Sequence, residues 1–476
     1  MLVVVLLVVL LVLALLAGVH WYVWRRLVRD TTARGGTARR VGTAAVWVLP
    51  LLSVAALVSG RAGAPFWLQR VVAWPGYLWL AVLLYLVLGL LVGEVVRPLL
   101  VRVAGGNSPT PPLPETGGRV PRTPGPPAAG FAAAADPTGA ETPGGFAAGT
   151  ADAAGQAPVG AAAPHEPAGA TRTAEPRPAP AEGMARTDEA EADDAGTIGR
   201  RTVSRRVFVS RVVGGGAAAV ALGTVAYGTY GVLCGPRVKR VTVPLARLPR
   251  AAHGFRIAVV SDIHLGPILG RGHTQRIVDT INATSPDLVA VVGDLVDGSV
   301  ADLGPAAEPL AQLTSRHGSF FVTGNHEYFS GAEEWVDHVR ELGLHPLRNE
   351  RVEIGGFDLA GVNDVAGESE GDGPDFAKAL GERDRTRASV LLAHQPVVIH
   401  DAVKHGVDLQ LSGHTHGGQL WPGNYLAALA NPTVAGLERY GDTQLYVTRG
   451  AGAWGPPVRV GAPSDITVVQ LASRQA

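Results

Sequence analysis

Four long apolar runs constrain the fold of this chain more than any other feature of its sequence. They cover about residues 1–23, 41–59, 74–96 and 207–233. Each run is long enough to cross the roughly 30 Å hydrocarbon core of a bilayer as a helix, and none shows a polar face at helical spacing. We therefore expect three transmembrane helices in a membrane domain over 1–103, and a basic segment with a fourth helix over 199–240.

The first apolar run is expected to remain in the protein as a membrane helix. A secretory signal peptide carries positive charge before a shorter apolar core and a small-residue cleavage site after it, and neither feature occurs here. The run ends instead in Trp21, Tyr22 and Trp24, together with Arg25 and Arg26. This edge is typical of an anchor at the surface of a membrane.

Arginine clusters predict the orientation of the chain. They lie after the first run and before the fourth, and comprise Arg25, Arg26, Arg29, Arg34, Arg39 and Arg40, then Arg200, Arg201, Arg205, Arg206 and Arg211. Such clusters stay on the cytoplasmic side of the membrane. With four spans, the chain after about Cys234 is therefore expected on the outer side of the membrane. Arg237, Lys239 and Arg240 argue mildly for the opposite orientation. We predict a multi-pass protein of the cell membrane with an extracytoplasmic C-terminal domain.

Residues 104–198 are expected to form a disordered linker. They are rich in Ala, Pro and Gly and nearly lack large apolar side chains, so they cannot bury a core. The stretch 204–208 after them resembles a twin-arginine export motif, and an orientation signal for the fourth helix explains its paired arginines equally well.

Charge and cysteine content limit the class of partner and of metal site. The formal net charge is +0, so the chain carries no overall attraction to nucleic acid, and none is expected as a partner. The one cysteine, Cys234, excludes an intramolecular disulfide and a thiolate metal cage. Any metal site must therefore use histidine, carboxylate or amide ligands.

From about residue 241 to 476, short β-branched runs alternate with stretches long enough for helices, which is typical of an α/β domain. Five of these runs end in residues of metal-ligand type. The five runs are 255–260, 287–292, 319–323, 389–393 and 407–412. They are followed, in the same order, by Asp262 and His264, by Asp294 and Asp297, by Asn325 and His326, by His394, and by His414 and His416. Ligands bind at the carboxyl ends of strands in an open α/β sheet, so we expect these residues to converge.

The spacing of these residues suits metal ions. In an extended segment the side chains at i and i+2 point the same way, so Asp262 and His264 can face one ion. His414 and His416 can likewise face the same cluster, and Asp294 is a natural bridge between two ions. Imidazole, carboxylate and amide ligands suit Zn, Mn or Fe. Each motif alone is commonly turn chemistry, and only the set of five argues for a metal site.

This series of motifs resembles the calcineurin-like metallophosphoesterase superfamily, and the sequence GHTHGGQ at 413–419 resembles its bacterial membrane-associated branch. The resemblance covers about residues 241–471. It implies a four-layer fold in which two mixed sheets pack face to face between helices. It also implies two divalent ions. One would be held by Asp262, His264, Asp294 and His416, and the other by Asp294, Asn325, His394 and His414.

Charge predicts how such a site would act. Two divalent ions bring four positive charges, while two aspartates and a bridging hydroxide remove three, so the site attracts an anionic phosphate. The hydroxide is expected to attack phosphorus directly. His326, beside Asn325, is expected to protonate the leaving alkoxide. Asp297 resembles the family carboxylate that orients this histidine, and a turn role next to Gly298 explains it equally well.

Other residues give weaker indications. Arg449, in a Gly-rich loop after a late strand, could contact phosphate, although a surface ion pair is the commoner role for such an arginine. Trp421 and Trp454 could border the pocket, and burial in the core is their commoner role. Asn363 and Asp364 could line the site or form a turn.

The sequence as a whole predicts a membrane-anchored phosphoesterase with two metal ions. It would hydrolyse a phosphomonoester, phosphodiester or pyrophosphate in a phosphorylated small-molecule or lipid-linked substrate. A membrane sensor that binds a phosphorylated ligand without turnover is the alternative, and the complete set of ligands and acid disfavours it. A nuclease is a third reading, weakened by the absence of a basic stripe.

Overall fold

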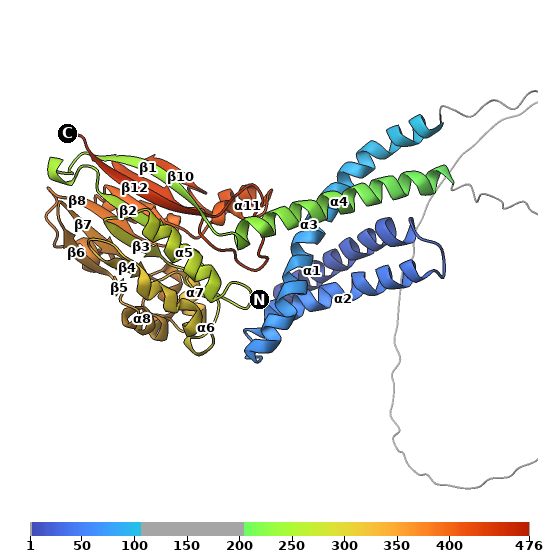
Figure 1. The fold of residues 1–476 in the computed structure, drawn as a ribbon, viewed down its shortest axis with the longest axis horizontal. Coiled ribbons are helices and arrows are strands. Elements are labelled where there is room, and N and C mark those ends of the chain that lie inside the picture. Colours follow the sequence, from blue (N-terminus) through green and yellow to red (C-terminus); the bar gives the residue numbers. More distant parts are fainter. Residues whose placement is uncertain (1, 106–203, 476) are drawn as a thin grey trace, which may run out of the picture. The chain divides into compact units, whose positions relative to one another are not determined.

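The computed structural model describes residues 2–105 and 204–475. The expected linker over 104–198 lies outside these residues, except at 104 and 105. Two regions are therefore described below: the apolar helices, and the α/β domain that follows the last of them (Figure 1).

Four helices of the described chain are long and apolar enough to cross a membrane. They are α1 (Leu2–Val23), α2 (Thr37–Ser59), α3 (Phe66–Gly105) and α4 (Arg205–Leu233), and a π-helical turn η1 (Trp24–Arg29) extends α1. The third helix is longer than the expected 74–96, and it contains Pro75 and Pro98. A proline within a membrane helix is tolerated where neighbouring groups satisfy the freed backbone.

Small residues bring these helices close together. A side chain added at Gly76 would collide with Leu52 and Ala56 of α2, and one added at Gly89 would crowd Ala217 of α4. Close approach of backbones at small residues is how helices associate in lipid. The helices therefore form one packed bundle, which Figure 1 shows beside the α/β domain.

Two six-stranded mixed sheets form the α/β domain. The first has the order β1-β12-β2-β3-β4-β5, with β1 (Arg237–Leu245), β12 (Asp465–Ser473), β2 (Arg256–Val260), β3 (Leu288–Val292), β4 (Ser319–Val322) and β5 (His345–Pro346). The second has the order β10-β11-β9-β8-β7-β6, with β10 (Gly436–Tyr440), β11 (Thr443–Val447), β9 (Leu409–Ser412), β8 (Ala388–Leu392), β7 (Phe357–Gly361) and β6 (Glu350–Ile354). Strands β2, β3 and β4 run parallel to one another, as do β7, β8, β9 and β11.

Alternate residues of the buried strands face two different layers. Val259 and Ala290 of the first sheet pack against Val390 of the second in one core. The residues between them in sequence, such as Val260 and Val289, pack under helices α5 (Arg271–Ala283), α6 (Val300–Ala307) and α8 (Ala332–Glu341). The second sheet is covered in the same way by α9 (Phe376–Leu380) and α10 (Ile399–Lys404). The expected four-layer α/β sandwich is thus confirmed.

The domain begins earlier than the expected boundary at residue 241. Strand β1 starts at Arg237, where it pairs in parallel with Asp465 of β12. Arg237, Lys239 and Arg240 therefore belong to a strand of the domain, and not to a loop next to the fourth helix. The sequence missed this start because exposed basic residues interrupt the apolar pattern of an edge strand.

The loop before β12 packs directly against the helix bundle. Val458 and Val460 belong to the same apolar cluster as side chains of α3 and α4. The backbone N–H of Arg459 between them donates to Gly228 O of α4, at 3.3 Å. Tyr85 Oη of α3 donates to Trp421 O at 2.9 Å. The α/β domain and the bundle thus share an interface.

Candidate metal centre

The seven expected ligands lie together where strand ends meet. Asp262 and His264 follow β2, Asp294 follows β3, Asn325 begins α7 (Asn325–Ser330) after β4, His394 follows β8, and His414 and His416 follow β9. These strands come from both sheets, and within each sheet they run parallel. Parallel strands end at the same edge, so the sandwich collects all seven residues along one rim.

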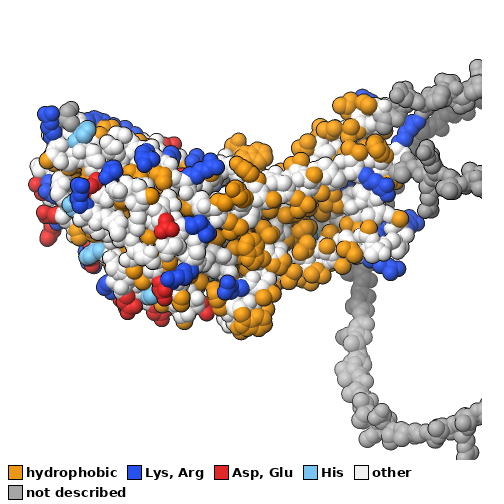
Figure 2. Space-filling model, in the orientation of Figure 1, with side chains coloured by type: hydrophobic (Ala, Val, Ile, Leu, Met, Phe, Trp, Pro, Cys, Tyr) orange, Lys and Arg blue, Asp and Glu red, His pale blue; other side chains and the backbone are white. Residues whose placement is uncertain are grey.

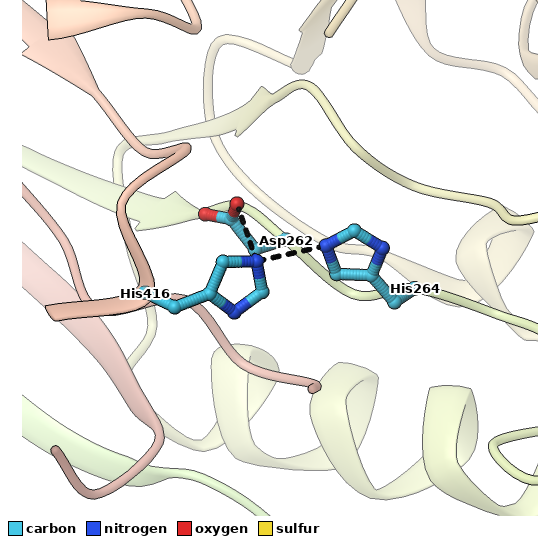
Figure 3. A group of neighbouring side chains, drawn as sticks. All are labelled: Asp262, His264 and His416. Carbon is cyan, nitrogen blue, oxygen red and sulfur yellow. Dashed lines mark hydrogen bonds and ion pairs between the residues drawn. The ribbon is translucent and has the colours of Figure 1, made fainter. Parts of the chain in front are cut away.

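Asp262, His264 and His416 form the first group of donors. His416 Nε2 lies 2.9 Å from His264 Nε2 and 3.3 Å from Asp262 Oδ1. Figure 3 shows the two rings and the carboxylate directed toward one another. The backbone N–H of His414 donates to both oxygens of Asp262, at 3.0 and 3.1 Å, which fixes that carboxylate. Three buried donors therefore converge on one point.

Asp294, His394 and His414 form a second group of donors. His394 Nε2 lies 3.1 Å from Asp294 Oδ2. His414 Nδ1 lies 3.0 Å from Asn325 Oδ1, which brings the expected amide ligand beside this group. These donors belong to the second ligand set that the family resemblance implies, and an overlapping cluster of His264, Asp294 and His326 joins them to the first group. That they bind metal stays a prediction.

Asp294 stands between the two groups. Its Oδ1 accepts a hydrogen bond from the backbone N–H of His326 at 2.9 Å. Its Oδ2 faces His264 Nε2 at 3.8 Å on one side and His394 Nε2 at 3.1 Å on the other. One oxygen is therefore held by the protein, and the other is placed to serve both groups, as expected of a bridging ligand.

The backbone at these residues is not extended, contrary to the reasoning from spacing. Five of them have a positive φ: Asp262 (52°), His264 (49°), Asp294 (53°), His414 (72°) and His416 (53°). The left-handed region is uncommon for residues with a side chain, and such strain is typical of functional sites. Each side chain is aimed by a sharp turn of the loop, rather than by the alternation of a strand.

Two glycines allow the loops to approach so closely. A side chain at Gly413 would collide with Asp262 and Ser261, and one at Gly324 would collide with Asp294. Neither position tolerates a Cβ without moving a ligand. The glycines of the GNH and GHTH motifs are therefore needed for this close packing.

The donors of this rim fit divalent cations. His394 Nδ1 lies 2.9 Å from Val292 O and donates to that carbonyl. The lone pair of His394 Nε2 is therefore free to bind a metal ion. His394 Nε2 is buried and has no aligned hydrogen-bond partner. Burial raises the pKa of Asp262, and the nearby Asp294 raises it further. A cation between these groups would satisfy the orphaned nitrogen and offset the repulsion of the carboxylates.

Asp297 links a ligand to the expected acid. Its Oδ1 lies 2.8 Å from His264 Nδ1 and 2.7 Å from His326 Nδ1. Burial alone would raise the pKa of Asp297, but the charges of both imidazoles and their hydrogen bonds lower it to about 2. The same carboxylate helps to raise the pKa of His264 to about 9, against the effect of burial. Asp297 therefore remains ionised and orients both rings.

A cavity of about 410 Å³ opens beside His326. His264, Asp297 and His326 line it on one side, together with Phe329 and Trp454. The rings of Phe329 and Trp454 meet that of His326 edge-on, with centroids 5.5 and 5.8 Å away. The expected acid therefore faces an open space of this volume.

Glu327 is a residue of this site that the sequence analysis missed. Its fully buried carboxylate accepts from the backbone N–H groups of Asp294, Leu295 and Gly324 at 3.0, 2.7 and 2.5 Å. Burial and the charge of Asp294 raise its pKa to about 7. It ties the turn carrying Asp294 to the turn carrying Asn325. Its only signal in the sequence was its place directly after the GNH motif.

Arg459 is the second residue that the sequence analysis missed. Its buried guanidinium donates to the carbonyls of His416, Arg449 and Gly452 at 2.9, 2.6 and 2.6 Å. Its Nη2 also lies 3.0 Å from His416 Nδ1, and burial lowers its pKa to about 10. A single arginine in an apolar run gave no spacing signal, yet it holds together the loops behind the first group of donors.

The weaker expectations have mixed outcomes. Arg449 forms an ion pair with Asp465 at 3.8 Å and does not line the cavity, so its contact with phosphate stays a prediction. The expected core burial of Trp421 and Trp454 is wrong, because both indoles are about half exposed, at 51% and 52%. Asn363 and Asp364 are buried. Asp364 caps a turn and accepts from Gln395.

Comparisons with known proteins indicate the family of this chain. The family model for "Calcineurin-like phosphoesterase" matches residues 255–418. A Danio rerio protein named "Transmembrane protein with metallophosphoesterase domain" is 40% identical over 259 residues, which are 52% of this chain and 59% of that protein. The chain therefore spans little more than half the length of that relative.

An "Uncharacterized metallophosphoesterase" from Aquifex aeolicus is 35% identical over 240 residues, which are 49% of this chain and 91% of that protein. A solved structure, a dimetal phosphatase from Danio rerio, is 13% identical with a TM-score of 0.34, and covers 46% of this chain and 93% of that one. Since the chain is 35% identical to the Aquifex protein and covers 91% of it, the chain belongs to the calcineurin-like metallophosphoesterase family.

Proposed function

We propose that this protein is a membrane-anchored phosphoesterase that uses two divalent metal ions to hydrolyse a phosphomonoester, a phosphodiester or a pyrophosphate. The observation that carries the proposal is the position of Asp294 Oδ2, which faces a histidine of each donor group. A carboxylate shared in this way suits a pair of ions rather than a single structural one.

The ions would be held by the two donor groups, with Asp262, His264, Asp294 and His416 around one ion, and Asp294, Asn325, His394 and His414 around the other. Such nitrogen and oxygen donors suit Mn, Zn or Fe. Bound there, the ions would supply the positive charge that attracts phosphate and that activates water for direct attack on phosphorus.

His326 would supply the proton that the leaving oxygen needs. Its Nδ1 is engaged by Asp297, so Nε2 is the nitrogen that can deliver a proton to a substrate. Asp297 fixes the orientation of this ring for that transfer. A group that leaves as a stable anion would need this proton much less than an alkoxide would.

We also propose that the four apolar helices cross the cell membrane and that the α/β domain lies on the extracytoplasmic side. Arginines gather at η1, in the loop before α2 and at the start of α4. Figure 2 shows Lys and Arg at the end of the bundle away from the α/β domain. Positively charged ends stay in the cytoplasm, so α4 would lead out of the cell into β1.

A turnover assay of the full-length protein tests the proposed function. Purified protein is depleted of metal and assayed on an aryl phosphodiester and an aryl phosphomonoester with Mn²⁺, Zn²⁺ or Fe²⁺. Release of the aryl group that needs metal and is lost in Asp294→Asn supports the enzyme. Tight binding of the phosphate compound without release, in all metals, would instead favour a sensor and overturn the proposal.

A further inference from the structure

The cavity beside His326 has a second wall that belongs to the helix bundle. It is formed by the end of α2, by the loop after it and by the first turns of α3, including Leu57, Arg61, Phe66 and Tyr77. The catalytic rim and two apolar helices therefore enclose the same space. A substrate that fills this cavity must contact both.

The position of the cavity indicates which part of the substrate enters it. Of the seven candidate ligands, only His264 lines the cavity, whereas His326 and Asp297 both do. His326 is the expected donor of a proton to the leaving group. The cavity therefore lies on the side of the leaving group, and the phosphate would bind at the rim behind it.

The chemistry of the cavity suits an apolar leaving group that carries polar oxygens. Phe329 and Trp454 are 66% and 52% exposed beside His326, and Leu57 and Phe66 face them from the bundle side. Arg61 forms no ion pair within the described part of the chain, and its one hydrogen bond is to Leu57 O at 3.4 Å. A guanidinium at the mouth of this cavity is placed to donate to a polar oxygen of the leaving group, such as an ester carbonyl, while the phosphate lies at the rim.

An apolar surface continues from this junction along the α/β domain. Helix α11 (Gly423–Ala430) buries none of its residues, and Tyr425, Leu426 and Leu429 are 66%, 71% and 84% exposed. The helix follows Trp421, whose carbonyl is bonded to Tyr85 of α3. Figure 1 shows α11 next to the end of α4, and Figure 2 shows hydrophobic side chains across this junction. Short helices with exposed apolar side chains beside a membrane span lie in the bilayer interface.

We infer that the substrate is an amphiphilic phosphate ester of the outer leaflet, and that its lipid part is the leaving alcohol. The inference rests on the proposed function and narrows its substrate class. The P–O bond to the lipid breaks, water adds to phosphorus, and the proton from His326 goes to the lipid oxygen. The products are a lipid alcohol, which stays in the bilayer, and a phosphate, which is released outside.

A comparison of two substrates tests this inference on the full-length protein in lipid nanodiscs. One substrate is a long-chain phosphatidate, and the other is p-nitrophenyl phosphate. Arg61→Ala is expected to lower kcat/KM on phosphatidate by about 10- to 100-fold, as for the loss of a hydrogen bond to a charged group, and to change the aryl substrate by less than about twofold. Arg61→Lys should restore part of the loss.

The control is Arg240→Ala, which removes the same charge from strand β1. Arg240 is exposed and does not line the cavity, so both substrates should react as with the parent protein. An equal loss on phosphatidate in both variants would mean that only the surface charge matters, and would overturn the assignment of Arg61.

A binding measurement keeps this inference separate from catalysis. Metal-free Asp294→Asn protein in nanodiscs is irradiated with a photoactivatable phosphatidate, and the labelled peptides are identified. Labelling of residues 57–77 and of the peptides that contain Phe329 and Trp454 would support a lipid site in the cavity. This labelling should be weaker in Arg61→Ala. Labels that a soluble glycerol phosphate removes equally well would show that the phosphate alone is recognised, and would overturn the lipid class.

The two failures are distinguishable. Labelling of the cavity without turnover of any ester would refute the proposed esterase while leaving the lipid site in place. Metal-dependent turnover of p-nitrophenyl phosphate, with no preference for phosphatidate and no cavity labelling, would leave the esterase in place and refute the inference.

Discussion

His326 Nδ1 lies 2.7 Å from Asp297 Oδ1, an oxygen that also lies 2.8 Å from Nδ1 of the ligand His264. One carboxylate oxygen therefore orients the proposed acid and one of the proposed metal ligands. Substitutions at His326 should thus separate proton transfer from metal binding, whereas substitutions at Asp297 should affect both.

The first prediction concerns His326. In His326→Ala, metal content should be unchanged, while kcat on an alkyl phosphodiester falls by roughly 10²–10⁴ because the alkoxide leaves without a proton. An aryl ester, which leaves without protonation, should lose much less. Steady-state kinetics with elemental analysis check this. An equal loss on both esters with metals retained would show that His326 binds phosphate or holds Asn325 in place.

The second prediction concerns Asp294. Asp294→Asn keeps the shape of the side chain and removes the charge shared by the two donor groups. Metal content and activity should fall together, on every substrate, because one oxygen serves both groups. Titration of the metal-depleted variant with Mn²⁺, followed by calorimetry and by activity, measures both. Full metal content in an inactive variant would assign Asp294 a purely catalytic role.

Glu327 gives a third prediction, about stability. Glu327→Gln leaves one oxygen where two accepted three backbone N–H groups, so the free energy of unfolding should fall by about 1–3 kcal/mol. The Tm should fall, and metal affinity should weaken because both ligand turns loosen. The exposed Glu341 provides the control, since Glu341→Gln removes the same charge without backbone contacts. An unchanged Tm in Glu327→Gln would show that the carboxylate is not needed to hold the turns.

The fourth prediction concerns pH and His273, whose ring nitrogens are buried without hydrogen-bond partners. Burial, with Arg276 and Arg459 nearby, lowers its pKa to about 3. Below about pH 6.5, His273 takes up a proton in the unfolded chain but stays neutral in the folded chain. The free energy of unfolding therefore falls as pH falls toward 3. At pH 5 this group accounts for about 2 kcal/mol.

Removing this histidine should therefore flatten the dependence of stability on pH. The decrease in Tm between pH 7 and pH 5 should be smaller in His273→Leu than in the parent protein. Scanning calorimetry at both values measures the difference. Parallel decreases in the two proteins would mean that His273 is protonated in the folded state.

Orientation is the subject of the fifth prediction. Cys234 is the only cysteine in the chain, so a Cys234→Ser background accepts single reporters. A membrane-impermeant maleimide should label Glu382→Cys in intact cells, because residue 382 is exposed on the α/β domain. Ala33→Cys, in the loop between η1 and α2, should be labelled only after lysis. The reverse pattern would place the domain in the cytoplasm and leave the metal site unaffected.

The sequence was sufficient for the donors and for the four layers, because both depend on local patterns. The continuous apolar runs of the strands indicate that both of their faces are buried. Asp262, Asp294 and His394 come just after the ends of such strands. It was not sufficient for the left-handed turns at these ligands, since their φ values are imposed by neighbouring loops. Nor could it reveal Glu327 or Arg459. Both act on backbone groups far away in sequence, and such contacts leave no spacing pattern.

Side chains at 458–460 point alternately toward the helix bundle and toward the candidate metal centre, and this has a consequence for how the protein should be handled. Val458 and Val460 pack into the helix bundle, while the side chain of Arg459 reaches the ring and the carbonyl of His416. A soluble fragment cut at residue 241 would lose half of β1 and leave these valines without partners. The helix bundle therefore does more than anchor the domain. A change in its packing would displace Arg459 and, through Arg459, the candidate ligand His416.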